Sequence, residues 1–146
     1  MGERISSFKD LRVYKLAFEL QQEIFALSKR FPVEERYSLT DQIRRSSRSI
    51  GANISEAWQK RPYIAHFVSK LTDADGEQAE TQHWLDTAAA CKYILEPEQK
   101  TMSERCSRIG RMLGAMMADP DKWCQKAEGF ERKSEKSAAR INPVGN

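Results

Sequence analysis

Helix-breaking residues are scarce in this chain. Its 146 residues include only five prolines and seven glycines, and no segment alternates convincingly between apolar and polar residues. Because proline ends helices and a period of two marks half-buried strands, this pattern excludes a β-rich fold and favours long helices. The length suits one domain with a real core and is too short for two ordinary ones.

Cysteine is also sparse. Cys91, Cys106 and Cys124 are odd in number and share no CxxC spacing, so the sequence suggests neither a disulfide framework nor a zinc site. We interpret them as reduced, buried thiols. The chain also lacks a signal-like apolar core near its N-terminus and any run approaching ~18 apolar residues. We therefore expect a cytoplasmic protein that does not bind membranes.

Neither sign of charge is strongly in excess. The 24 basic and 21 acidic residues leave a net charge of +3, with a pI near 8.8. That is well short of the charge of a protein that coats nucleic acid over its whole surface. Any nucleic-acid contact would therefore depend on local basic patches.

Capping and proline signals divide the chain into four helices. The boundaries are Ser7 with Asp10, Phe31-Pro32 after Arg30, Ser38 with Asp41, Pro62, and Pro97 after Leu95. Short loops between helices imply antiparallel neighbours, so we predict an all-α, up-down-up-down four-helix bundle over residues 1–118. Residues 119–146 are expected to form a charged, partly disordered C-terminal extension that starts as a helix around Trp123.

The second helix has the most informative pattern. Its core-facing residues recur at helical spacing: Leu39, Ile43, Ser47, Ile50, Ile54, Ala57 and Trp58. A polar stripe borders them: Gln42, Arg45, Ser49, Asn53, Glu56 and Lys60. Such a border is half buried and its groups need partners, so we expect Asn53 and Glu56 to bond to other helices or subunits.

The third helix is acidic where the second is basic. An antiparallel turn near Pro62 places Arg45 level with Glu77 and Ser49 level with Asp73. We therefore assign a structural polar network or interface to Gln42, Arg45, Ser49, Asn53, Glu56, Glu77 and Glu80.

Other arginines point outward. Arg44 and Arg48 lie on the outer flank of the second helix, where a guanidinium could contact phosphate. Lys100, Arg108 and Arg111 share one exposed side of the fourth helix. These five residues are the candidate nucleic-acid contacts.

The first helix is apolar over roughly half its circumference. Tyr14, Phe18 and Phe25 point one way, and a second row that includes Leu20 and Ile24 covers the adjoining arc. A single bundle contact needs little more than ~100°. Self-association would bury the excess, and a wider internal core is the alternative.

Evidence for catalysis is weak. Glu80 and His83 form one ExxH, but a di-iron bundle needs a second, and the other histidine, His66, follows Tyr63 at that spacing. The glycines form neither a phosphate loop nor a dinucleotide fingerprint. We expect no enzymatic activity, metal, cofactor or small-molecule substrate.

One signature in the second helix resembles that of the bacterial four-helix-bundle family encoded in intervening sequences of ribosomal RNA genes. It consists of Gln42, Arg44, Arg45, Ser49, Ile50, Asn53, Ile54 and Glu56. The likeness extends from about Phe8 to Leu95, through Leu11, Val13, Tyr14, Phe31, Pro32, Glu80, Thr81, Trp84, Leu85, Cys91 and Tyr93. Ala57, Ser46 and Ser55 depart from it.

The resemblance implies a bundle that assembles into a ring-like pentamer. On that basis we expect a homo-oligomeric accessory protein that offers a repeated basic surface to RNA, DNA or a protein–RNA complex. The alternative is a homo-oligomeric scaffold that binds a protein and no nucleic acid.

Overall fold

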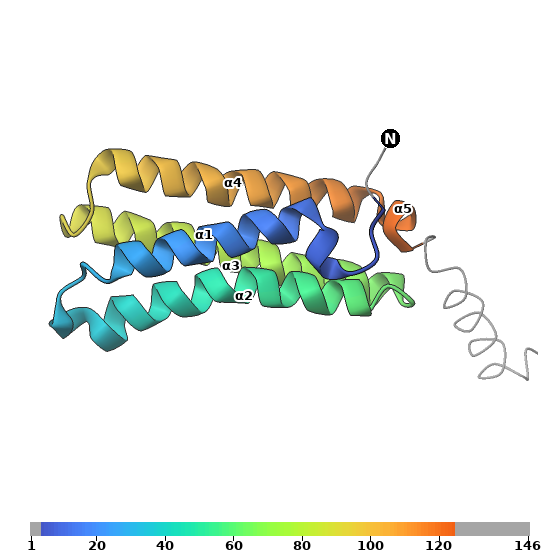
Figure 1. Ribbon diagram of the computed structural model, residues 1–146, viewed down its shortest axis with the longest axis horizontal. Helices are drawn as coiled ribbons and strands as arrows, with labels where there is room; N and C mark the ends of the chain where they lie inside the picture. The colour runs from blue at the N-terminus through green and yellow to red at the C-terminus, as the bar shows by residue number, and fades with distance from the viewer. Residues whose placement is uncertain (1–3, 125–146) are drawn as a thin grey trace, which may run out of the picture.

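Four long helices dominate the computed structural model, which describes residues 4–124. They are α1 (Arg12–Ser28), α2 (Asp41–Gln59), α3 (Ile64–Ala90) and α4 (Glu96–Ala118). The helices run alternately up and down along one axis, each beside the next in chain order, and α4 returns beside α1 (Figure 1). The predicted four-helix bundle is confirmed. A short helix, α5 (Pro120–Cys124), follows α4 and packs on α3 and α4.

The N-terminal capping box is present but caps a different element. Ser7 Oγ accepts a hydrogen bond from the Lys9 amide at 3.2 Å, and Asp10 Oδ2 accepts one from the Ser7 amide at 3.2 Å. This box starts a single 3₁₀ turn, η1 (Phe8–Asp10), and α1 begins only at Arg12. Hydrogen bonds from Ser6 and Ser7 also lower the pKa of Asp10.

The predicted box at Ser38 and Asp41 is wrong. A 3₁₀ turn, η2 (Val33–Glu35), and a π-helical turn, η3 (Arg36–Thr40), precede α2 directly. The chain is therefore already helical before Asp41, whose amide donates to the Arg36 carbonyl. Ser38 is exposed, and no side chain caps α2.

The third helix ends five residues earlier than predicted, at Ala90 rather than near Leu95. Lys92 adopts the left-handed backbone conformation (φ 64°), and the Tyr93 amide reaches back to the Ala88 carbonyl at 2.9 Å. This is a standard helix stop. The Tyr93 hydroxyl then donates to Glu35 at 2.9 Å, a bond that raises the pKa of Tyr93 to about 12.

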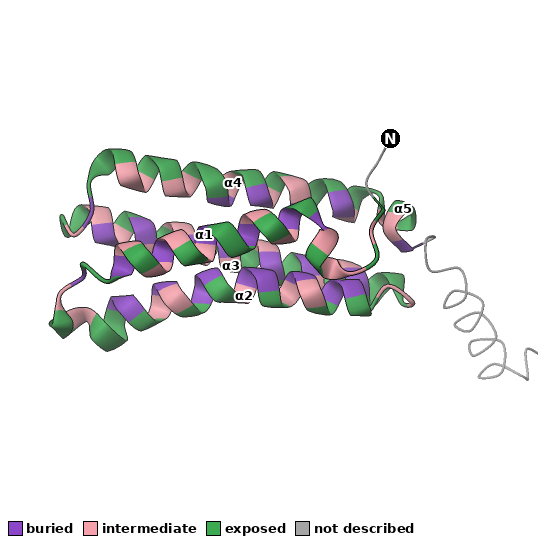
Figure 2. Cartoon of the chain, viewed as in Figure 1, coloured by how far each residue is buried: buried purple, intermediate pink, exposed green. Residues whose placement is uncertain are grey.

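The core lies along the bundle axis, where buried residues line the inward faces of the helices (Figure 2). All seven predicted seam residues are buried, Leu39 in η3 and the other six in α2. Cys106 and Cys124 are buried as predicted, and burial raises the pKa of the Cys106 thiol to about 12. The prediction fails for Cys91, which is exposed because α3 ends at the preceding residue.

Within residues 4–124 no helix is both long enough and apolar enough to cross a membrane. The C-terminal extension begins with α5, which contains Trp123. Residues 125–146, and the tail expected there, lie outside the described residues.

Candidate nucleic-acid interface

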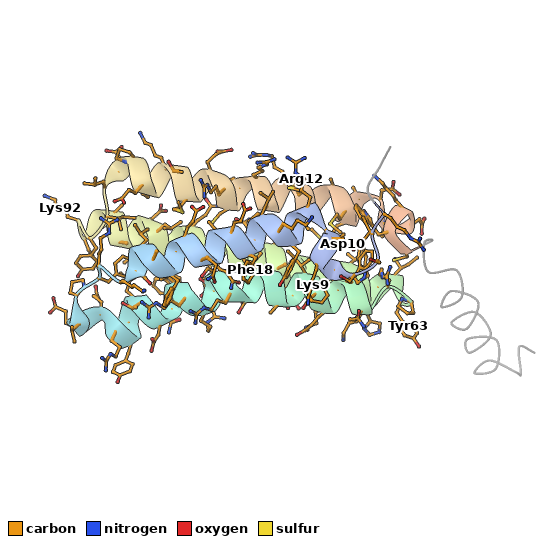
Figure 3. The ribbon with its side chains drawn as sticks, in the orientation of Figure 1. Lys9, Asp10, Arg12, Phe18, Tyr63 and Lys92 are labelled. Carbon is orange, nitrogen blue, oxygen red and sulfur yellow. The ribbon has the colours of Figure 1, made fainter. Side chains whose placement is uncertain are left out.

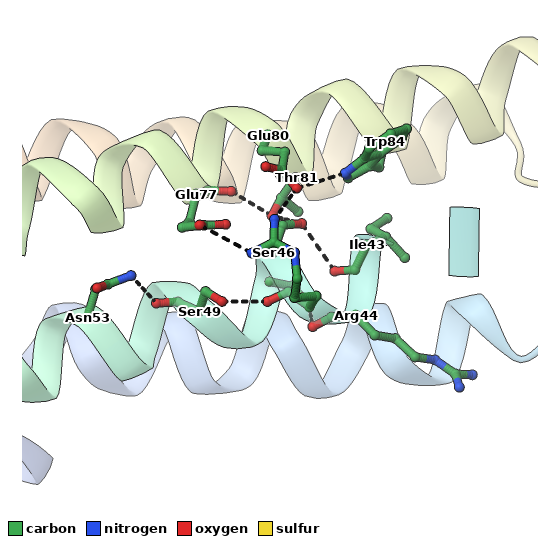
Figure 4. Close-up of polar contacts among 11 residues, drawn as sticks. Ile43, Arg44, Ser46, Ser49, Asn53, Glu77, Glu80, Thr81 and Trp84 are labelled. Carbon is green, nitrogen blue, oxygen red and sulfur yellow. Dashed lines mark hydrogen bonds and ion pairs between the residues drawn. The ribbon is translucent and has the colours of Figure 1, made fainter. Parts of the chain in front are cut away.

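Arg45 is neutralised by the third helix. Its Nη1 lies 3.3 Å from Glu77 Oε1, in the register expected from the turn at Pro62, and its Nη2 bonds to Glu80 (Figure 4). Trp84 Nε1 also donates to Glu80, at 3.1 Å. The hydrogen bonds that Arg45 donates to Glu80 and Glu77 raise the pKa of Arg45. Burial alone would raise the pKa of Glu80, but the bonds from Trp84 and Arg45 bring it below its usual value.

A second, fully buried contact joins the same helices. Thr81 Oγ1 donates to Ser46 Oγ at 2.9 Å, and Ser46 Oγ donates to the Ile43 carbonyl at 3.3 Å (Figure 4). Sequence reasoning missed this pair. The available signal was that Ser46 replaces the alanine usual in the resembled family, since a buried hydroxyl needs a partner.

The remaining border residues divide between local and interhelical contacts. Glu56 lies 2.9 Å from Lys70 Nζ on α3, as expected of a residue bonded to another helix. Within residues 4–124 Asn53 does not bond to another helix, because its side-chain amide donates to the Ser49 carbonyl one turn back, at 2.9 Å, and its contact with another subunit stays a prediction. The Ser49 hydroxyl likewise bonds to the Arg45 carbonyl and not to Asp73. Gln42 is half buried.

Arg44 and Arg48 turn away from this network toward α1. Arg44 Nε donates to Ser28 Oγ at 2.7 Å, and its guanidinium lies 4.7 Å from the centre of the Phe25 ring. Arg48 lies 5.3 Å from the same ring. Neither arginine forms an ion pair with any residue in the described part of the chain.

Lys29 completes this group and was missed by sequence reasoning. Its Nζ lies 4.7 Å from the centre of the Phe25 ring, and it too has no ion-pair partner in the part of the chain seen. The signal was its position four residues after Phe25, on the same helical face. We call Lys29, Arg44 and Arg48, gathered on Phe25, the basic cluster.

The predicted residues of α4 lie elsewhere. Lys100 Nζ is 3.3 Å from Glu96, and Arg111 Nη2 is 2.9 Å from Glu104 Oε1. Arg108 lines a cavity of about 210 Å³ between α4 and α1. Since the basic cluster lies between α1 and α2, the five predicted residues do not form one patch.

An aromatic row leads along α1. The rings of Phe8 and Tyr14 lie 4.9 Å apart, and those of Tyr14 and Phe18 lie 6.3 Å apart. Phe18 is 46% exposed and lies on α1, which runs beside α2 in this view (Figure 3). The excess apolar surface of α1 is thus partly solvent-facing, and Phe25 is covered by the basic cluster.

Nothing in the ExxH pair suggests a metal centre. The Glu80 carboxylate is engaged by Arg45 and Trp84, and the His83 ring packs edge-on against Trp84. No group of three or more histidine, cysteine, aspartate or glutamate residues is arranged to hold a metal within the described range.

The fold and the polar pattern of α2 together define the class of protein: a small antiparallel four-helix bundle with a polar stripe along its second helix. The family model of the 23S rRNA-intervening sequence protein matches residues 9–115, and the chain belongs to this family. The resemblance predicted from the α2 signature is thereby confirmed.

A crystal structure shows a similar fold. It is that of a protein with unknown function from the S23 ribosomal protein family of Bacteroides thetaiotaomicron, 31% identical to this chain. The match covers 72% of this chain and 97% of that one, with a TM-score of 0.66. No curated protein shows significant similarity.

Proposed function

We propose that this protein is a non-enzymatic, homo-oligomeric accessory protein that binds RNA through the basic cluster. One observation carries the proposal. Three cations gather on one ring without a carboxylate partner among residues 4–124, whereas Arg45, on the same helix as Arg44 and Arg48, is neutralised by Glu77 and Glu80. The association of the family with ribosomal RNA genes supports the choice of ligand.

The chemistry of the cluster suits phosphate. Arg44 donates a hydrogen bond from its Nε–H to Ser28, so its two terminal NH₂ groups remain available as paired donors to phosphate oxygens. Packing on Phe25 fixes the plane of the guanidinium. No feature of the cluster reads base edges, so we expect binding that depends on charge and little on sequence.

The few cations of one subunit would bind RNA only weakly, and an oligomer that repeats the basic cluster would bind it more tightly. Each phosphate contact adds a released counterion, and linked copies bind with increased avidity. Within the proposal, Arg108 is a secondary contact on another face. Lys100 and Arg111 could join it, since exposed ion pairs such as theirs contribute little and exchange readily.

Phe18 supplies the test of assembly. We propose that a second copy covers this ring, and that the oligomer has five subunits, as the family resemblance implies. Phe18→Glu would place a charge in that contact and should yield monomers with the helical content of the wild type. Light scattering at micromolar concentration measures the mass. The exposed Tyr37→Glu, at 73% exposure, is the control and should leave the mass unchanged. A monomeric wild type would contradict the proposal.

Salt-dependent binding tests the RNA contact. Replacing both Arg44 and Arg48 by alanine should weaken binding to unrelated RNA sequences and reduce the slope of log K against log salt. The reduction is about 0.7 unit for each lost contact with single-stranded RNA. Arg45→Ala with Lys60→Ala removes the same amount of charge, from α2 and from the residue that follows it. Arg45 is already neutralised, so this control should change the slope less.

The protein-binding scaffold remains the second candidate. It is favoured by apolar side chains exposed outside the basic cluster, among them Phe18 and Leu95, the latter at 66% exposure. If the wild type binds neither RNA nor DNA at low salt, or if the double variant binds as tightly as the wild type, the role of the basic cluster is wrong and the scaffold is preferred.

A further inference from the structure

A small apolar pocket opens at the corner where α1, α4 and α5 meet. Its volume is about 280 Å³, somewhat below the ~300–1,000 Å³ of typical small-molecule sites. Apolar side chains form most of its lining: Leu11, Val13, Met112, Ala115, Met116 and Trp123. The charged residues Arg12, Asp119 and Lys122 complete it. Its size suits a single aromatic side chain.

The pocket is rimmed by available positive charge. Within residues 4–124, neither Arg12 nor Lys122 forms an ion pair, and Lys122 Nζ lies 5.4 Å from the Trp123 ring. Arg12 is the first residue of α1, whose N-cap, Leu11, offers no side-chain hydrogen bond (Figure 3). The positive end of a helix favours a carboxylate. The fitting occupant is therefore an aromatic ring flanked by acids.

The chain itself carries such a segment close by. The described part ends at Cys124, one residue after the pocket residue Trp123, at the end of the bundle where α1 begins (Figure 1). Beyond it, Phe130 is the sole aromatic residue in the sequence, with Glu128 and Glu131 on either side. Phe130 lies six positions after Cys124, and such a span can reach about 20 Å.

We propose that this pocket is the docking site for residues 128–131 of the same chain, with the Phe130 ring among Met112, Met116 and Trp123. Glu128 and Glu131 then face Arg12 and Lys122. A short tether holds the segment at an effective concentration in the millimolar range, so even a weak contact is populated. The site is independent of the proposed RNA contact, because the basic cluster lies between α1 and α2.

Methionine methyl groups report on this pocket in the full-length protein. With ¹³C-methyl methionine, Phe130→Ala should move the Met112 and Met116 signals by more than their line width, because the ring current is lost. Met102 lines a different groove, and Met117 Sδ accepts a hydrogen bond from Thr72 Oγ1, so both should stay in place. Spectra that superpose at Met112 and Met116 overturn the proposal.

Matched variants separate this segment from the rest of the tail. Ile141→Ala should leave all four signals unchanged, and an effect there equal to that of Phe130→Ala overturns the assignment to Phe130. Glu128→Lys with Glu131→Lys should reproduce part of the shift, while Glu135→Lys should not. If the double reversal has no effect, the charge contacts are wrong.

Mixing distinguishes the same chain from a neighbouring copy. Labelled Phe130→Ala protein is combined with unlabelled wild type and allowed to exchange subunits. The labelled Met112 and Met116 signals should keep the positions seen in the Phe130→Ala variant alone, because each pocket is filled by the segment of its own chain. A return to the wild-type positions would mean that the segment comes from another copy, and the proposal of docking within one chain would fall.

Discussion

The boundary between α2 and α3 and the boundary between α1 and α4 are built differently. Between α2 and α3, the fully buried hydroxyls of Ser46 and Thr81 bond to each other, and Arg45 bridges two carboxylates at the edge. Along α1 and α4 lie three cavities of about 550, 210 and 280 Å³. Within residues 4–124, the ion pairs that cross this boundary are the largely solvent-accessible pairs of Arg30 with Glu98 and Arg105 with Glu23.

Chain connection explains part of this difference. A short turn at Pro62 joins α2 to α3, so side chains at matching heights meet and polar groups can be paired inside the contact. The first and last helices are joined only through the rest of the bundle. Surface ion pairs contribute little to stability, so the boundary between α1 and α4 is held mainly by the common core. It is the boundary at which the bundle can admit another group.

The largest expected effect is on core packing. Ile50→Ala, in the fully buried seam of α2, should lower the free energy of unfolding by about 2–5 kcal/mol, because it leaves a cavity. Met102→Ala, on the half-buried side of the 550 Å³ groove, should cost about 1 kcal/mol, because less apolar surface is lost. Urea unfolding followed by circular dichroism measures both. Equal costs would mean that the boundary of α1 and α4 is as closed as the seam of α2.

Two glycines of α4 sharpen the comparison at its contact with α3. A Cβ added at Gly110 would lie 2.8 Å from Gln78 Nε2, which bonds to Asp75, whereas a Cβ at Gly114 meets nothing within 4 Å. Gly114→Ala should therefore stabilise the helix by about 0.5–1 kcal/mol. Gly110→Ala should not be stabilising and should instead lower the free energy of unfolding by about 1 kcal/mol, because the added methyl group disturbs the hydrogen bond from Gln78 to Asp75. Melting temperatures should move in opposite directions, and a shared increase would show that Gln78 yields freely.

The smallest effects concern the ion pairs. Arg45→Ala should lower the free energy of unfolding by about 1 kcal/mol and Arg105→Ala by less than about 0.5 kcal/mol. Both effects are small because both side chains are partly exposed, Arg45 to 49% and Arg105 to 45%. The larger loss is expected for Arg45 because it pairs with two carboxylates, one of which also accepts a hydrogen bond from Trp84. Chemical denaturation at pH 7 compares them, and a larger loss for Arg105→Ala would reverse the ranking.

Acid should remove the contribution of Arg45. The pKa of Glu80 is lowered in the folded protein from its ordinary value of 4.5, so its stabilising contribution is complete above about pH 4.5 and is lost as the pH falls further. The difference in stability between wild type and Arg45→Ala should therefore shrink between pH 5 and pH 3. The difference should persist unchanged if neither Glu80 nor Glu77 is the partner of Arg45.

Much of the fold could be predicted because it depends on periodicity and on residue type. The spacing of Ile43, Ile50 and Ile54 identified the buried face of α2, and the turn at Pro62 set the register of Arg45 against Glu77. Such features are local, or follow from antiparallel geometry alone.

Other features could not be predicted because they depend on choices between local and distant partners. Asn53 was expected to bond to another helix or subunit, but its side-chain amide donates one turn back on its own helix, where the carbonyl of Ser49 is within reach. The π-helical start of α2 replaces the cap expected from Ser38. The basic cluster was incomplete without Lys29, because a cation on α1 joins those on α2 only after the helices pack.

The bond between Arg44 and Ser28 has a thermodynamic consequence. A free arginine side chain carries about 2 kcal/mol of rotamer entropy, which is usually surrendered when a ligand fixes it. Here the Nε–H bond and the Phe25 ring have already removed most of that freedom during folding. An anion meeting this guanidinium therefore encounters donors whose direction is set in advance, and its binding orders little more of the protein. Lysine at this position would keep the charge but, with no Nε–H to anchor, would lose that advantage.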